Sequence, residues 1–131
     1  MARSVLDTSY LIQWWRKKNS ATRKVTERMI VKWANELQAM HETNAIVTPV
    51  VIEFIAGAQS RQESQHFEIY LDQFDIVDRG QITADDWKKA RQFAKRIPRN
   101  GKPRQLGDCL ISAIAQRLHH DVLTLDTDFP K

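Results

Sequence analysis

Short aliphatic segments alternate along this chain with longer segments of helical periodicity, and this alternation limits the possible folds more than any other feature. Aliphatic and β-branched runs predict strands at residues 3–7, 45–48 and 122–125, with a weaker fourth candidate at residues 75–78. Apolar residues at three-and-four spacing predict helices around residues 11–15, 29–40, 87–97 and 110–118. Because parallel strands need crossover helices, we expect an α/β fold in which two helical layers enclose a small, mostly parallel sheet of four to five short strands.

Local signals at the helix starts agree with these predictions. Thr48 followed by Pro49 predicts an N-cap and a first helical residue, because proline lacks the N–H group that would be unpaired there. Thr83 and Asp86 have the spacing of a capping box. The helix that follows them is expected to bury a face made of Trp87, Ala90, Ala94 and Ile97.

The composition is typical of one compact domain, residues 1–131, with 42% hydrophobic and 27% charged residues. Cys109 is the single cysteine, so an internal disulfide is impossible and a reducing cytoplasm is the expected location. No apolar run approaches the roughly 20 residues that span a bilayer, and a charge interrupts the N-terminus before signal-peptide length. We therefore expect a cytoplasmic protein without membrane association.

Positive charge is concentrated in two windows of a chain whose net charge is +4. Residues 8–26 contain no acid, and their bases are Arg16, Lys17, Lys18, Arg23 and Lys24. In residues 96–107 the charged side chains are Arg96, Arg99, Lys102 and Arg104. Each window is a candidate for contact with a polyanion, with a solvated helix end or loop as the alternative.

Acidic side chains follow the first and last predicted strands. Asp7 closes the first strand, Asp126 closes the last, and Asp128 lies two residues further on. In open α/β sheets, ligands bind in the crevice beyond the carboxyl ends of the strands. These acids are therefore candidates for one binding site, while capping of nearby backbone N–H groups is the alternative for each of them alone.

Glu53 stands alone among apolar residues. It is the only charged residue between Glu42 and Arg61, in a predicted helix that is apolar nearly all round, so its carboxylate is expected to be partly buried. Burial of a carboxylate costs several kcal/mol unless a positive or hydrogen-bonding group compensates. A metal ion is the favoured partner, and a buried arginine is the alternative. Asp108 begins the helix that runs to about residue 119, where it is either a second metal ligand or a plain N-cap.

Four widely separated acids, Asp7, Glu53, Asp108 and Asp126, would repel each other in one crevice unless a cation were present. Oxygen ligands without histidine or cysteine indicate a hard cation, Mg²⁺ or Mn²⁺, rather than zinc. No Ser-His-Asp or Cys-His arrangement emerges from the sequence. The expected chemistry is therefore metal-assisted hydrolysis of a phosphodiester, in which carboxylates hold one or two ions.

Four motifs of the chain resemble, in order and spacing, the acidic motifs of PIN-domain nucleases. They are Leu6-Asp7-Thr8-Ser9, Pro49-Val50-Val51-Ile52-Glu53, Gly107-Asp108-Cys109-Leu110-Ile111-Ser112-Ala113 and Leu123-Thr124-Leu125-Asp126-Thr127-Asp128-Phe129. The resemblance covers nearly the whole chain, and the VapC-type toxins of VapBC toxin–antitoxin systems look most similar. Family members usually continue past the Asp-Phe pair into a final edge strand, whereas this sequence ends at Pro130-Lys131, so an exposed sheet edge or a shortened fold is expected.

The resemblance implies a PIN-like fold and a Mg²⁺- or Mn²⁺-dependent endoribonuclease that cleaves structured RNA such as tRNA or rRNA. It also implies the toxin of a type II toxin–antitoxin module, a homodimer, and inhibition by a cognate VapB-like antitoxin. The acids that match the family's metal-site positions are Asp7, Glu53, Asp108 and Asp126, with Asp128 as a fifth ligand or an outer group. The hydroxyls expected to orient carboxylates or water belong to Thr8, Ser9 and Thr124. A non-catalytic PIN-like module that binds RNA or a protein is the alternative.

RNA has to approach an acidic crevice, so a rim of basic side chains is needed to bind its phosphates. The loop that leads to Asp108 carries the predicted RNA contacts, which are Arg99, Lys102 and Arg104. Trp14 and Trp15 cannot both face the core from one helix, so one of them is a candidate for covering a dimer or antitoxin groove.

Overall fold

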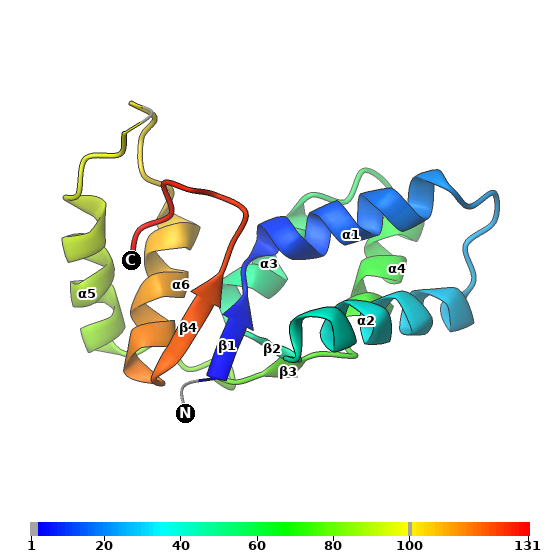
Figure 1. Ribbon diagram of the computed structural model, residues 1–131, viewed down its shortest axis with the longest axis horizontal. Coiled ribbons are helices and arrows are strands. Elements are labelled where there is room, and N and C mark those ends of the chain that lie inside the picture. The colour runs from blue at the N-terminus through cyan, green and yellow to red at the C-terminus, as the bar shows by residue number, and fades with distance from the viewer. Residues whose placement is uncertain (1–2, 100) are drawn as a thin grey trace.

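The computed structural model describes residues 3–99 and 101–131, and within these residues it contains four strands and six helices (Figure 1). The first half of the chain comprises β1 (Arg3–Leu6), α1 (Thr8–Ser20), α2 (Glu27–His41), β2 (Ala45–Ile46) and α3 (Thr48–Ala56). The second half comprises α4 (Arg61–Leu71), β3 (Asp75–Ile76), α5 (Ala84–Ala94), α6 (Leu106–Arg117) and β4 (His120–Leu123).

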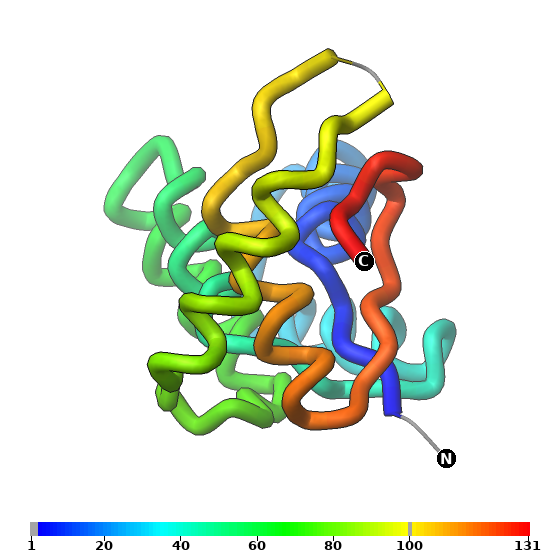
Figure 2. The backbone as a smooth tube through the Cα atoms, turned by 90° about the vertical axis from the view of Figure 1, so that its left-hand side faces the viewer, coloured from blue at the N-terminus to red at the C-terminus, as the bar shows by residue number. Residues whose placement is uncertain are grey.

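The four strands form one parallel sheet in the order β3-β2-β1-β4. The longest pairing joins β1 to β4, with Leu6 opposite Leu123 at its carboxyl end. Helices α5 and α6 pack together on one side of the sheet, in front of it in Figure 2, while α1, α2 and α4 lie on the other side (Figure 1). The predicted α/β fold with a small parallel sheet between helical layers is confirmed.

Two buried clusters hold the layers together. The larger one joins the sheet to helices α1 to α4 and to α6, and within it the ring of Trp15 packs against Phe67 and Tyr70 at centroid distances of 5.1 and 5.3 Å. The smaller cluster joins α5 to α6 through side chains that include Phe93 and Leu110. Full burial of such a side chain contributes about 1.5–3 kcal/mol, so hydrophobic packing fixes α6 relative to α5 and α1 relative to α4.

Some strand ends differ from the prediction. β4 runs from His120 to Leu123 rather than over residues 122–125, and Leu125 is 44% exposed. The prediction that Asp126 closes the last strand is therefore wrong, because Asp126 lies three residues beyond β4. The physical reason is that β4 pairs only with β1 in this sheet, so the chain leaves the sheet where β1 ends.

The N-cap prediction at Thr48 is also wrong. Val47 occupies the N-cap position and Thr48 already belongs to α3. The carboxylate of Asp78, which is 4% exposed, accepts hydrogen bonds from the Thr48 backbone N–H at 3.1 Å and from Thr48 Oγ1 at 2.8 Å. An acid from the segment after β3 thus supplies the acceptor that a local cap residue would otherwise provide.

The predictions for α4 and α5 agree with the structure only in part. The capping box of Thr83 and Asp86 at the start of α5 is confirmed. Helix α4 lies where the sequence analysis predicts no helix, although Ser60 caps it by accepting from the Glu63 N–H at 3.0 Å. Its first half is polar, so apolar periodicity is confined to its last turns.

The buried face of α5 differs from the predicted one. Trp87 is 49% exposed and Ile97, beyond the helix end, is 91% exposed, whereas Asp86, Ala90 and Phe93 are buried. Asp86 tolerates burial because Arg117 of α6 donates to it at 2.8 Å. The residue of α5 that pairs with α6 therefore lies on the buried face of the helix, and apolar spacing alone does not predict this face.

The two tryptophans of α1 diverge as expected. Trp15 is buried in the core, while Trp14 is only partly buried and donates from Nε1 to the Trp33 carbonyl at 2.9 Å. Among the described residues, no helix combines the length and apolar character needed to cross a bilayer.

Candidate active site

Asp7 lies directly after β1, at the N-cap position of α1, and is 4% exposed. Its Oδ2 accepts hydrogen bonds from Ser9 Oγ at 2.9 Å and from Thr124 Oγ1 at 2.8 Å. Within the described part of the chain, its side chain makes no capping hydrogen bond to α1. The carboxylate is therefore held by one hydroxyl from the first turn of α1 and one from the segment after β4, rather than used as a helix cap.

Glu53 projects from α3 and is partly buried between α1 and α6. Its Oε1 accepts a hydrogen bond from Thr8 Oγ1 at 3.0 Å. On its other side the carboxylate lies against Gly107, where an added Cβ would stand only 2.6 Å from Glu53 Cδ and Oε2. Glu53 thus contacts the chain neighbours of both Asp7 and Asp108, which brings three acids from separate elements to one place.

Glu53 forms no ion pair with an arginine in the described part of the chain, so the alternative of a buried arginine partner is wrong. Among residues 3–99 and 101–131, the two side-chain ion pairs are Lys18–Glu36 and Arg117–Asp86. Burial raises the pKa of Glu53, the Thr8 hydrogen bond opposes that rise, and the charge of Asp7 adds to it. The carboxylate of Glu53 is therefore partly desolvated without a positive side chain to compensate.

Asp108 is the third residue of α6, whose N-cap is Gln105, so the prediction that Asp108 begins the helix is wrong by two residues. Burial, together with the charges of Asp7, Glu53 and Asp126, raises the pKa of Asp108 to about 7, while the charge of Arg104 acts in the opposite direction. An acid whose pKa is raised in this way belongs to a site with excess negative charge.

Asp126 and Asp128 lie in the segment that leaves β4. The backbone N–H of Asp126 donates to Thr124 Oγ1 at 3.0 Å, and the Asp128 N–H donates to Asp126 Oδ1 at 2.9 Å. Thr124 therefore links this turn to Asp7, since its hydroxyl also donates to the Asp7 carboxylate. Asp108, Asp126 and Asp128 share a cavity of about 110 Å³.

The basic loop between α5 and α6 borders the same cavity. Lys102 and Arg104 line it, and Arg99 is exposed, while residue 100 of this loop lies outside the described residues. Arg104 donates from Nε to the Arg96 carbonyl at 2.8 Å and also hydrogen-bonds the Asp128 carbonyl. Its guanidinium therefore fastens the loop to the acidic turn beside Asp108.

The donor chemistry of this site fits a hard divalent cation. Carboxylate and hydroxyl oxygens surround Asp7 and Glu53, and burial together with the charges of neighbouring acids raises the pKa values of Glu53 and Asp108. In the residues that the structure describes, no three His, Cys, Asp or Glu side chains are already arranged to hold a metal ion.

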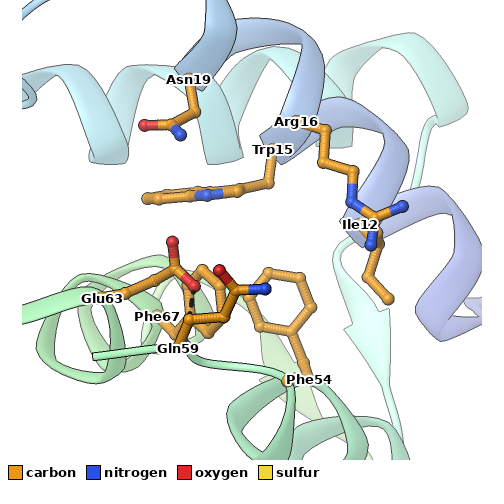
Figure 3. Close-up of a pocket in the computed structure, with 9 residues that line it drawn as sticks. Ile12, Trp15, Arg16, Asn19, Phe54, Gln59, Glu63 and Phe67 are labelled. Carbon is orange, nitrogen blue, oxygen red and sulfur yellow. Dashed lines mark hydrogen bonds between the residues drawn. The ribbon is translucent and has the colours of Figure 1, made fainter. Parts of the chain in front are cut away.

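A larger cavity, about 210 Å³, lies between α1, the end of α3 and α4 (Figure 3). Trp15, Phe54 and Phe67 form its apolar part, and Trp15 Nε1 is buried without a hydrogen-bond partner in the described structure. None of the predicted site acids lines this cavity. The larger cavity and the acidic site are therefore separate features of the surface.

Sequence reasoning missed two residues that shape the site. Gly107 appears in an acidic motif, but its close approach to Glu53 requires the packing of α3 against α6. Asp78 fixes the N-terminus of the helix that carries Glu53, and its position as the last residue of the weakest predicted strand was the only signal for it.

A small parallel sheet with acids near the carboxyl end of its strands defines an α/β protein with an acidic site. Residues 4–131 match the PIN domain family, and the chain therefore belongs to that family. The PIN domain is a nuclease-type fold, its members are generally hydrolases that cut nucleic acid, and they typically use divalent metals. A comparison with curated proteins found no match.

Proposed function

We propose that this protein is a Mg²⁺- or Mn²⁺-dependent endoribonuclease, with residues 1–131 as one nuclease domain. The observation that carries the proposal is the position of Glu53, whose carboxylate lies between Thr8 and Gly107, the chain neighbours of Asp7 and Asp108. Three carboxylates that converge from β1, α3 and α6 without a basic partner for Glu53 favour a cation site over a structural ion pair.

The residues that would hold the ion are Asp7, Glu53, Asp108 and Asp126, with Asp128 beside them. A divalent ion at this place supplies stabilisation of phosphate charge and lowers the pKa of water. Thr8 orients Glu53, while Ser9 and Thr124 orient Asp7 through their hydroxyls. Burial and the neighbouring acids raise the pKa of Asp108 to about 7, and a positive charge at this place would favour loss of its proton.

RNA is proposed to enter beside the loop that carries Arg99, Lys102 and Arg104. Lys102 and Arg104 line the cavity that contains Asp108 and Asp126, so phosphates near the cleaved bond would pass within reach of them. Because Arg104 already hydrogen-bonds two backbone carbonyls, its part is to hold the loop in place as well as to add positive charge.

We further propose that the enzyme acts in the cytoplasm as the toxin of a type II toxin–antitoxin module, as a homodimer, and that a VapB-like antitoxin inhibits it. Support for this comes from the resemblance of its four acidic motifs to those of VapC-type toxins, and tRNA or rRNA is the proposed substrate. Fold alone does not set a substrate, so these points need their own experiments.

Cleavage of purified total tRNA, with and without Mg²⁺, tests the nuclease proposal for the wild type and for Asp7→Ala. We expect cutting by the wild type with Mg²⁺, none after chelation, and a loss of at least about 100-fold in the variant. Binding of tRNA without metal-dependent cutting would instead favour a non-catalytic module, which is the alternative function.

Expression of the chain in bacteria tests the toxin role. We expect growth arrest from the wild type and normal growth from Asp108→Ala at equal protein levels. Equal toxicity of the two versions would show that the arrest does not come from cleavage at this site.

A further inference from the structure

The positive charge of the protein is concentrated on residues 8–34, which comprise α1, the turn after it and the first half of α2, and are called the α1–α2 arm here. Within these residues seven Lys and Arg stand against one acid, Glu27, a net charge of +6. The whole chain has a net charge of +4, so the remaining residues together carry −2. The arm therefore differs in sign from the rest of the molecule.

The bases of the arm are exposed to solvent. Arg16, Lys17, Arg23, Lys24, Arg28 and Lys32 are exposed, and Lys18 is half-buried. In the described part of the chain, Lys18 is the one base of the arm that forms an ion pair, with Glu36 at 3.7 Å. The other Lys and Arg side chains of the arm form no ion pair among the described residues. They can therefore contact a phosphate without first breaking an ion pair.

The arm is a fixed scaffold that starts at the acidic site. Helix α1 begins beside Asp7 and has 13 residues, which at about 1.5 Å per residue gives a length of about 20 Å. Trp14 Nε1 donates to the Trp33 carbonyl, and the rings of Trp15 and Trp33 pack at 5.4 Å, so α1 and α2 move together. In Figure 1 the turn between α1 and α2 lies at the opposite end of the molecule from α5.

We propose that the α1–α2 arm is a second RNA-binding surface, which holds the phosphate backbone of a folded RNA about 20 Å from the bond that is cut. This proposal rests on the proposed nuclease function. The acids of the site repel a polyanion, so attraction has to come from another part of the surface, and the unpaired bases of the arm provide it. The enzyme therefore selects RNAs large enough to reach the acidic site and the arm together.

Binding without catalysis tests the arm directly. The variant Arg23→Gln, Lys24→Gln, Arg28→Gln is compared with the control Lys88→Gln, Lys89→Gln, Arg91→Gln, which removes the same charge from α5 at the other end of the molecule. The affinity for purified tRNA is measured in chelator over a range of salt concentrations. The arm variant is expected to lose at least about tenfold in affinity, and its log–log salt slope to fall by about 2–3, while the control changes less than about twofold.

Unchanged tRNA binding by the arm variant, or an equal loss in the α5 control, would overturn the proposal. An acidic protein as the true partner of the arm would give the first of these results. Circular dichroism and the melting temperature of each variant show whether its helices and core are intact. The substituted residues are exposed except Lys89 of the control, which is half-buried with its Nζ 5.7 Å from the centre of the Phe93 ring.

Cleavage of two substrates separates this proposal from the nuclease proposal. With Mg²⁺, the arm variant is expected to cut a short unstructured oligoribonucleotide at the wild-type rate and to cut tRNA at low concentration about tenfold more slowly. Equal slowing on both substrates would overturn the selection of large RNAs. If the wild type cuts neither substrate, the nuclease proposal fails, and the binding comparison still decides whether the arm holds RNA.

Discussion

The carboxylate of Glu53 occupies the space into which any residue other than glycine at position 107 would extend its side chain. The separation of 2.6 Å between Glu53 Cδ and a Cβ at this position is far below van der Waals contact. Gly107 lies within the first turn of α6, so close approach rather than an unusual backbone angle accounts for this glycine. The contact is what places Glu53 beside Asp108.

Substitution of Gly107 by alanine is therefore expected to displace the Glu53 carboxylate while the fold persists. The atoms that a Cβ would meet are the far end of a flexible side chain, and alanine favours a helix over glycine by about 1 kcal/mol, so the melting temperature should hold or rise. We expect RNA cleavage to fall by at least about tenfold. Gly57→Ala is the matched control, because its Cβ would meet only backbone oxygens at 3.4 Å or more. Wild-type cleavage by Gly107→Ala would show that the contact has no part in catalysis.

Thr124 joins Asp7 to the turn that carries Asp126, because one hydroxyl donates to Asp7 and accepts from the Asp126 N–H. Thr124→Val keeps the shape of the side chain and removes both hydrogen bonds. We expect a loss of about 10–100-fold in metal affinity or in kcat, as is typical when a group that orients a metal ligand is removed. Thr124→Ser should restore most of the activity, and failure of serine to do so would point to packing by the methyl group instead.

The stability of the metal-free protein should depend on pH through Asp108. Its pKa is raised from 3.8 to about 7, so the folded state retains a proton that the unfolded chain releases. The free energy of unfolding is therefore expected to decline between about pH 4 and pH 7 and to level off above that range. Denaturant titrations in chelator should show the decline in the wild type and a flatter profile in Asp108→Asn. Identical profiles for the two proteins would contradict the burial and crowding of this acid.

Mg²⁺ is expected to stabilise the wild type more at pH 8 than at pH 5. The ion requires an ionised Asp108, and at pH 5 a proton occupies that carboxyl. Thermal unfolding with and without Mg²⁺ at the two pH values measures the difference. A stabilisation that is equal at both values would mean that the ion binds elsewhere.

Replacement of Asp78 by alanine should destabilise the fold without touching the site acids. Its buried carboxylate accepts from the Thr48 N–H and Oγ1, and the loss of these bonds leaves the N-terminus of α3 without an acceptor. We expect a decrease of about 1–3 kcal/mol in the free energy of unfolding, measured by denaturant titration. Asp72→Ala, at an exposed position after α4, is the control and should change stability by less than about 0.5 kcal/mol.

Agreement between sequence and structure is best where a signal is local. Leu11 and Trp15 in α1, and Ile111 and Ile114 in α6, are buried as their spacing predicts, because a helix that faces a core shows its face in its own sequence. The prediction of the buried face of α5 was wrong, because the partner of the buried Asp86 lies 31 residues away on α6. No periodicity within α5 contains that information.

The candidate site divides in the same way. Sequence order alone picked out Asp7, Glu53 and Asp108 as unusual acids, since an acid after a strand, within an apolar helix or near a helix start is visible in a short window. It misplaced Asp126 relative to β4, because where a strand ends depends on the length of its neighbour.

The amino-acid sequence by itself determined the order of the strands and of the helices other than α4, and it identified Asp7, Glu53 and Asp108 as candidate site acids. Only the tertiary structure decided that Glu53 meets Gly107 and that Asp78 caps α3. Periodicity and capping depend on residues that are close together in the chain, so a short segment of sequence is enough to predict them. Contacts between residues far apart in the chain depend on how whole helices pack, and they exist only once the core has fixed those helices in place.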